Sequence, residues 1–176
     1  MDTFEAIGKR HSYRGSFDGR TVPREDLLRI VQAGIQAPSG HNAQSTSFVI
    51  VDEPSLIAKM AEITDNDVIR GSPAAIACVM DPRVSPGKKL SFGVEDYSAA
   101  VENMLLAITA MGYASVWIDG VLREGERSVQ VGDLLCVPRG REVRVILPVG
   151  VPVEHARQKE KKPLAERAWF NRYRGA

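Results

Sequence analysis

The joint between an apolar helical pattern and a short apolar run most constrains what this chain can fold into. It covers residues 35–51 and reads IQAPSGHNAQSTSFVIV. Pro38 ends a helix because proline lacks a backbone N–H, and Gly40 permits backbone conformations that are closed to other residues. Residues 47–51 then have the length and composition of a buried strand. The joint therefore predicts a helix, a tight polar loop and a strand in direct succession.

Similar patterns recur along the rest of the chain. Five segments with helical periodicity cover residues 2–9, 23–35, 53–63, 96–111 and 124–135. Four apolar runs that suit strands cover residues 47–51, 74–80, 114–118 and 143–149. In the first helix, Phe4 and Ile7 are expected to face inward, and the polar residues 84–92 are expected to form a surface loop. No repeat or linker interrupts this order, so residues 1–176 are expected to form a single domain of the α+β or α/β class.

The composition argues against several functions. The chain has 176 residues, with 44% hydrophobic residues, 26% charged residues and a formal net charge of +1. These values are typical of a globular protein, and the small net charge gives no broad field that would attract nucleic acid or an anionic membrane. No apolar stretch is long enough to span a bilayer. Cys78 and Cys136 each lie among apolar neighbours, so both are expected to be buried thiols, which fits a reducing cytoplasm.

The loop at residues 37–44 is rich in neutral hydrogen-bonding groups. Ser39, Asn42 and Gln44 offer donors and acceptors without fixed charge. Such a loop suits a flat, uncharged ring that forms hydrogen bonds. An ordinary turn of proline, glycine and asparagine residues would look the same when it is considered alone. The choice between a ring-binding loop and an ordinary turn therefore depends on the other residue clusters of the chain.

Two basic clusters lie at opposite ends of the chain. Residues 10–14 read RHSYR, and arginine side chains with a serine hydroxyl suit a phosphate monoester. Arg10 and Arg14 would share one face if the first helix continued that far. Residues 159–162 read KEKK and precede an aromatic group at residues 169–173, which indicates that the tail docks on another surface. Each cluster could also be a solvated basic surface, or the two could close over one anion.

Several common functional motifs are absent from the sequence. It contains neither G-x-G-x-x-G nor G-x-x-x-x-G-K-[ST], so neither common nucleotide fingerprint applies. It also lacks H-E-x-x-H, paired C-x-x-C and G-x-S-x-G motifs. Because the chain has only three histidines, few residues are available for a catalytic triad or a metal centre, and no metal is expected.

Five segments, in this order and spacing, resemble motifs of the nitroreductase family of FMN-dependent oxidoreductases. They are residues 10–14 (RHSYR), residues 37–51 (APSGHNAQ and the strand-like run), residues 96–114, residues 117–120 (WIDG), and residues 148–152 (PVGVP) followed by 161–164 (KKPL). The resemblance covers nearly the whole chain. It implies an α+β fold, a three-layer α/β/α sandwich with a mostly antiparallel central sheet, and an intertwined homodimer with FMN at the subunit interface.

The resemblance also implies roles for individual residues. Residues 10–14 correspond to the family element that binds the phosphate and ribityl chain, and residues 38–44 to a loop that approaches the flavin from the other subunit. Residues 119–120 correspond to backbone amides near the reactive edge of the ring, and residues 159–161 to basic phosphate contacts of the tail. The cofactor-binding residues implied in this way are Arg10, His11, Ser12, Arg14, Pro38, Ser39, Gly40, Asn42, Gln44, Asp119, Gly120, Lys159 and Lys161.

The implied activity is ping-pong transfer of a hydride from NADH or NADPH, through the N5 atom of FMN, to a nitroaromatic, a quinone or a similar acceptor. The flavin carries the redox chemistry, so no protein nucleophile is required, and His41 is a candidate proton donor. Two alternatives stay open. The same fold could run another flavin reaction, such as reductive dehalogenation, dehydrogenation or flavin breakdown, or the chain could be a flavin-binding module without turnover. The chain departs from the family pattern at His11 and Lys161, where arginine is common, and at residues 45–46, where Pro-Trp is usual.

Overall fold

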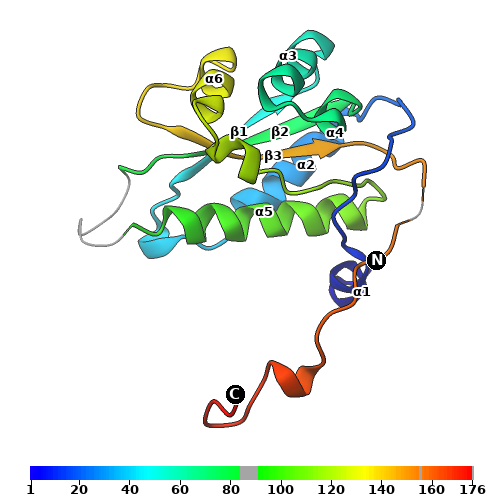
Figure 1. Ribbon diagram of the computed structural model, residues 1–176, viewed down its shortest axis with the longest axis vertical. Coiled ribbons are helices and arrows are strands. Elements are labelled where there is room, and N and C mark those ends of the chain that lie inside the picture. The colour runs from blue at the N-terminus through cyan, green and yellow to red at the C-terminus, as the bar shows by residue number, and fades with distance from the viewer. Residues whose placement is uncertain (84–90, 155, 176) are drawn as a thin grey trace.

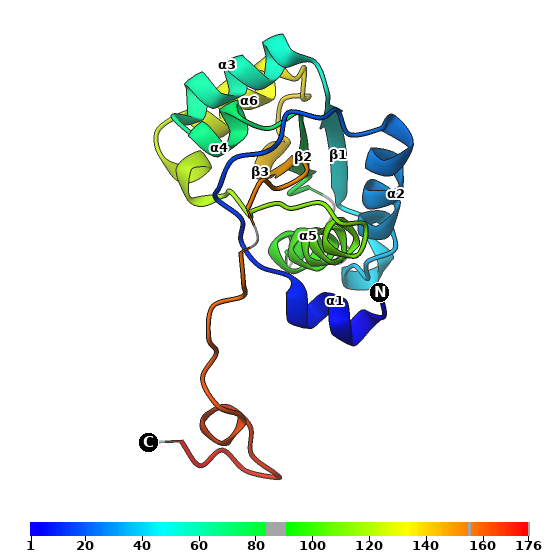
Figure 2. The ribbon, with the colours of Figure 1, turned by 90° about the vertical axis from the view of Figure 1, so that its right-hand side faces the viewer.

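The computed structural model describes residues 1–83, 91–154 and 156–175 (Figure 1). Residues 84–90 of the expected surface loop lie outside this set. The described residues form one small sheet with helices on both of its faces, and a C-terminal tail that extends away from them (Figures 1 and 2). In this described part of the chain, no helix combines the length and the apolar character needed to cross a bilayer.

A three-stranded antiparallel sheet forms the centre of the fold. Its strands, in spatial order, are β1 (Thr46–Val51), β2 (Ala74–Met80) and β3 (Glu142–Val149). The register pairs Phe48 with Cys78 and Ile76 with Leu147. Every residue of β2 is buried, as expected for a central strand that is covered on both faces. Three of the four predicted strands are therefore confirmed.

Helices cover both faces of the sheet and give the fold three layers (Figure 2). One layer contains α2 (Arg24–Ile35) and α5 (Gly93–Ala110), and the other contains α3 (Pro54–Thr64), α4 (Asp67–Arg70) and α6 (Arg127–Leu134). Alternate residues of β2 serve the two layers: Ile76 and Cys78 pack with α2 and α5, whereas Ala75 and Ala77 pack with the other three helices. This arrangement confirms the expected α+β fold with an α/β/α sandwich.

The predicted strand at residues 114–118 is not a continuous strand. It lies antiparallel to the end of β3, but it pairs only through isolated bridges, from Ala114 to Gly150 and from Ile118 to Ile146. The register that joins these bridges places Val116 opposite Pro148. Because proline has no backbone N–H, the hydrogen bond that would connect the two bridges cannot form. The prediction of a fourth full strand was wrong for this reason.

The first helix lies outside the three layers. α1 (Thr3–Lys9) begins after Asp2, whose side chain accepts a hydrogen bond from the Glu5 N–H (2.8 Å). Its buried residue is Ala6, whereas Phe4 is 86% exposed and Ile7 is 48% exposed. The prediction that Phe4 and Ile7 face inward is therefore wrong within one chain. A short helix beside α5 can cover only one of its sides, and here that side is the one with the small residue.

The helix predicted over residues 124–135 begins three residues later and ends one residue earlier than expected. A 3-10 helix, η2 (Gly120–Arg123), precedes a turn, and α6 begins only at Arg127. Cys136 follows α6 in a left-handed conformation (φ 55°) and is exposed, so the prediction that both cysteines are buried holds for Cys78 alone. The backbone reversal after α6 turns the Cys136 side chain outward. Burial raises the pKa of the Cys78 thiol to about 12.

The tail after residue 156 extends away from the three layers (Figures 1 and 2). Its regular element is a short 3-10 helix, η3 (Leu164–Glu166). The rings of Trp169 and Tyr173 pack on each other with centroids 4.3 Å apart, and Phe170 is 91% exposed. The expected docking of the aromatic residues thus does not occur on the layers of the same chain.

Candidate functional site

Tyr13 holds the first basic segment against the body of the protein. α1 ends at its C-cap, Arg10, and beyond it the Tyr13 N–H donates a hydrogen bond to the Ser115 carbonyl (2.8 Å). The Tyr13 ring is fully buried, whereas Ser12 and Arg14 on either side of it are exposed. Because the helix does not continue to Arg14, the two arginines do not share a helical face. Instead, the extended backbone presents Ser12 and Arg14 on the outer side.

A pocket of about 440 Å³ joins this segment to the start of the tail. Gln158 makes the connection, because its Nε2 donates hydrogen bonds to the carbonyls of Arg10 (2.8 Å) and Ile7 (3.3 Å). The residues that line the pocket are Arg10, His11, Ser12, Arg14, Ala156, Arg157, Gln158, Lys159 and Lys161. The structure therefore brings both predicted basic clusters to one place. Gln158 and Arg157 were not predicted to belong to the site, because no motif marks either of them.

The pocket has an excess of positive charge. Arg10 Nε lies 3.2 Å from a carboxylate oxygen of Glu102 on α5, so this arginine is already neutralised. Arg14, Lys159 and Lys161 are exposed, and none of them forms an ion pair with another described residue. Cations without a carboxylate partner suit a phosphate group, which carries about −1.5 to −2 charges at neutral pH. The donor set therefore fits a phosphate monoester.

His11 adds an unsatisfied polar atom to the same pocket. Its Nδ1 lies 2.9 Å from the Lys9 carbonyl, which can only accept, so Nδ1 carries the hydrogen of this bond. Its Nε2 is buried and has no partner among the described residues. Buried polar atoms are nearly always paired in folded proteins, so a bound molecule with a hydroxyl group would supply the missing partner by donating a hydrogen bond to Nε2.

The loop between α2 and β1 has a strained backbone. Within and after its 3-10 helix, η1 (Gly40–Asn42), the φ angles are positive at His41 (54°), Asn42 (55°) and Gln44 (50°). The left-handed conformation is unfavourable for residues with a Cβ atom, and such strain gathers at functional sites. Gly40 does not have a positive φ, contrary to the prediction. It is needed for space, because a Cβ atom at this position would lie 2.5 Å from the Phe92 ring.

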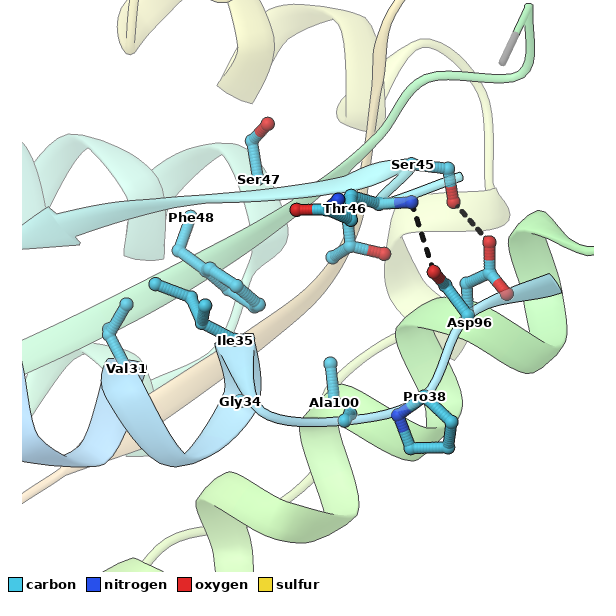
Figure 3. A pocket seen from close by; sticks show the side chains of 13 residues that line it. Val31, Gly34, Ile35, Pro38, Ser45, Thr46, Ser47, Phe48, Asp96 and Ala100 are labelled. Carbon is cyan, nitrogen blue, oxygen red and sulfur yellow. Dashed lines mark hydrogen bonds between the residues drawn. The ribbon is translucent and has the colours of Figure 1, made fainter. Parts of the chain in front are cut away.

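A buried carboxylate anchors this loop. Asp96, in the first turn of α5, is 5% exposed, and its Oδ1 accepts a hydrogen bond from the Gly40 N–H (2.7 Å). Its Oδ2 accepts one from the buried Ser45 hydroxyl (2.6 Å; Figure 3). Within the loop, the Ser39 hydroxyl oxygen accepts from the Gln44 N–H (3.0 Å). From the sequence, Asp96 was expected only to begin a helix and a family motif, and this anchoring contact was not predicted.

A cavity of about 380 Å³ lies beside the loop, between α2, β1 and α5 (Figure 3). Its walls combine apolar side chains, such as Val31 and Phe48, with hydroxyl groups. Pro38, Ser39 and Gln44 are the predicted site residues that line it. A cavity with apolar walls and neutral polar groups suits a planar, uncharged ring system.

The remaining predicted residues lie outside both cavities. His41 and Asn42 are exposed at the tip of the loop. Asp119 precedes η2 and forms an ion pair with Arg123 (2.7 Å), and Gly120 is exposed beside it. Within one chain, the predicted residues thus occupy three places: the basic pocket, the strained loop, and the start of η2. Among the described residues, no three His, Cys, Asp or Glu side chains converge as a metal site would require.

Known proteins match this chain in sequence and in structure. A model of the Nitroreductase family matches residues 7–75 and 64–151. A protein of Archaeoglobus fulgidus, provisionally named NADH dehydrogenase/NAD(P)H nitroreductase, is 34% identical over 152 residues, which are 86% of this chain and 86% of that relative. The NADPH-flavin oxidoreductase of Vibrio harveyi is 26% identical over 183 residues, with 98% of this chain and 75% of the relative covered. A crystal structure from Parabacteroides distasonis, with the same provisional name, has a TM-score of 0.85 at 27% identity and covers 97% of this chain and 98% of that one.

Proposed function

The chain belongs to the nitroreductase family, and from this premise we propose that it is an FMN-dependent NAD(P)H oxidoreductase that works as a homodimer. Residues 1–176 are proposed to form one domain, and NADH or NADPH is the reductant. The acceptor is proposed to be a nitroaromatic, a quinone or a similar small molecule. Turnover is ping-pong, so the reductant leaves before the acceptor binds at the same position.

The single observation that carries this proposal is the basic pocket built from the two ends of the chain. Arg14, Lys159 and Lys161 supply positive charge that no described carboxylate balances, and the buried Nε2 of His11 lacks a partner. An FMN phosphate and ribityl chain would offer the matching anion and hydroxyl groups. Unbalanced cations beside an unpaired acceptor nitrogen are the features that a phosphorylated, hydroxyl-bearing ligand would need.

FMN would supply the redox chemistry, accepting a hydride from NAD(P)H and passing the two electrons on to the acceptor. The chain's own residues would bind and orient it. Arg14, Lys159 and Lys161 would hold the phosphate, and the amide side chains of Asn42 and Gln44 would face the polar edge of the ring. The backbone at residues 119–120 would offer N–H donors near the reactive edge, where developing negative charge is stabilised by fixed dipoles.

A second subunit is part of the proposal because one chain leaves large apolar side chains exposed and keeps the predicted site residues in separate places. Large apolar side chains stand exposed on α1, α2 and the tail, and they are Phe4, Ile7, Leu28, Ile35, Leu164 and Phe170. Charge is also divided between body and tail. Residues 156–176 contain seven Lys or Arg and two Glu, against 16 basic and 20 acidic residues in the rest of the chain. A basic, aromatic tail therefore complements the acidic body of a second copy.

The two cysteines support a reducing compartment. Cys78 and Cys136 are both free thiols, and persistent disulfides are typical of oxidising compartments. We retain the cytoplasm as the proposed location.

The test is a visible spectrum of the purified protein, recorded before and after addition of NADH or NADPH without oxygen. The expected protein is yellow, is bleached by the reductant, and regains its colour when a quinone or nitroaromatic is added. A colourless protein that added FMN cannot reconstitute would contradict the proposal. Bound flavin with no acceptor-dependent NAD(P)H oxidation would indicate a different flavin reaction or a binding module.

A further inference from the structure

Asp96 links the first turn of α5 to both ends of the strained loop. Its carboxylate accepts hydrogen bonds from the Gly40 N–H, near the start of the loop, and from the Ser45 hydroxyl, at the start of β1. Asp96 and Ser45 are both buried. Hydrogen bonds to a carboxylate are stronger than neutral ones, and water competes little for them in a buried position.

The segment between these two anchors would not keep its conformation by local preference. His41, Asn42 and Gln44 all have positive φ angles, and none of them is glycine. Each is less stable in this conformation than in an ordinary one, so a free loop of this sequence would populate other conformations. The hydrogen bond from the Gln44 N–H to the Ser39 hydroxyl oxygen, within the loop, offsets part of this cost, and contacts from outside the loop add to this stabilisation.

Phe92 adds a second contact from the same end of α5. Its ring lies edge-on to the His41 ring, with centroids 5.7 Å apart, and it occupies the space that a side chain at Gly40 would need. The start of α5 therefore contacts the loop in two ways: Asp96 forms hydrogen bonds, and Phe92 packs against it. Of these two contacts, the carboxylate alone reaches both ends of the strained segment.

We infer that Asp96 is the positioning residue of the cofactor-binding loop, and that it holds residues 40–45 in their strained conformation before any cofactor binds. This inference rests on the proposed function. The side chains of Asn42 and Gln44 would then be in place when FMN arrives, and the free energy of ordering the loop would not be subtracted from binding. Without Asp96, the loop would relax, and FMN binding would have to restore the strain.

Three substitutions separate positioning from general destabilisation. Asp96→Ala removes both hydrogen bonds, whereas Asp96→Asn retains an oxygen for the Gly40 N–H and an amide group that can donate to the Ser45 oxygen. Ser45→Ala removes one bond and tests the same contact if Asp96→Ala does not fold. The matched control is Asp81→Ala, because Asp81 is a similarly buried carboxylate (6% exposed) whose side chain contacts Arg83 and Arg141. Its backbone N–H donates a hydrogen bond to the Ser45 carbonyl (2.8 Å), and the alanine variant keeps this bond, so the control removes a buried carboxylate without removing a contact to the loop.

Two measurements are made on each variant: FMN affinity by fluorescence titration of the apoprotein, and amide hydrogen exchange of peptides covering residues 40–45. Asp96→Ala is expected to weaken FMN binding by about 10- to 100-fold and to speed exchange in this segment of the apoprotein. Ser45→Ala should weaken binding by about 3- to 10-fold, and Asp96→Asn should stay within about 5-fold of the wild type. Asp81→Ala should change FMN affinity by less than about 2-fold.

A folded Asp96→Ala protein with wild-type FMN affinity, or with unchanged exchange at residues 40–45, would overturn the inference. If Asp96→Ala does not fold, wild-type affinity and exchange in Ser45→Ala would do the same. Equal losses of FMN affinity in Asp81→Ala and Asp96→Ala would also overturn the inference, because they would show that removal of either buried carboxylate has this effect. A wild-type protein that binds no FMN would instead contradict the proposed function, and the exchange data would still show whether Asp96 fixes the loop.

Discussion

Arg14 lies in the basic pocket and forms no ion pair with a described carboxylate, so its substitution should affect the cofactor with little effect on the fold. Arg14→Ala is expected to weaken FMN binding by about 10- to 100-fold, because it removes charge-assisted hydrogen bonds to the phosphate. The amount of flavin that stays bound through gel filtration is a direct measurement. Arg70→Ala, on α4 in the opposite layer, is the matched control. Unchanged flavin retention in Arg14→Ala would contradict the phosphate assignment.

The residues that the sequence analysis missed are those whose partners lie far along the chain. Asp96 binds Gly40, 56 positions away, and Gln158 binds Arg10, 148 positions away. Neither contact has a local signature, because an acid in the first turn of a helix or a glutamine in a polar tail is ordinary by itself. The RHSYR and APSGHNAQ segments were predictable because each gathers its unusual residues within one short stretch.

At the scale of elements, a buried carboxylate with two arginine partners connects the end of β2 to the start of β3. Asp81 follows β2 and accepts hydrogen bonds from Arg83, and it also lies 3.2 Å from Arg141, just before β3. The Arg83 guanidinium is the main reason that the pKa of Asp81 is lowered from 3.8 to about 2. Because the folded-state pKa is lowered, the stabilisation is fully present above about pH 4 and is lost as the pH falls toward 2.

The substitution that tests this carboxylate is Asp81→Asn. It should lower the free energy of unfolding by about 1 kcal/mol at pH 7, a value reduced because the Arg83 side chain is largely exposed to solvent. Urea unfolding of both proteins at pH 7 and pH 3 measures the difference, which should be smaller at pH 3. A difference that is the same at both values would show that the charge of Asp81 does not contribute.

Element boundaries were predictable where the apolar pattern alone decides them. The runs at residues 47–51, 74–80 and 143–149 form strands because each one pairs with a neighbouring strand and contributes apolar side chains to both layers of the core. Residues 114–118 have the same composition, but Pro148 on the neighbouring strand interrupts their hydrogen bonds. Whether residues 114–118 form a full strand thus depends on a proline in the neighbouring strand, and the periodicity of one segment does not reveal such a dependence.

At the scale of the whole molecule, one chain does not bring the predicted site together. The basic pocket and the strained loop lie on different parts of the surface, and the tail carries exposed aromatic residues beyond the pocket that Lys159 and Lys161 line. A second copy would cover the apolar side chains of α1 and α2 and would receive the tail. In such a pair, the loop of one subunit would complete the pocket of the other.

Deletion of residues 164–176 separates the two roles proposed for the tail, because it leaves Lys159 and Lys161 in place and removes the exposed Leu164, Phe170 and Tyr173. The shortened protein is expected to sediment as a monomer and to bind FMN at least about 10-fold more weakly, since the partner's loop no longer reaches the pocket. Replacing Arg172 and Arg174 with serine in the full-length chain is the control, and it should leave a dimer that binds FMN normally if the apolar contacts dominate. A shortened protein that stays dimeric and keeps wild-type FMN affinity would show that the subunits associate, and the site forms, without the aromatic end of the tail.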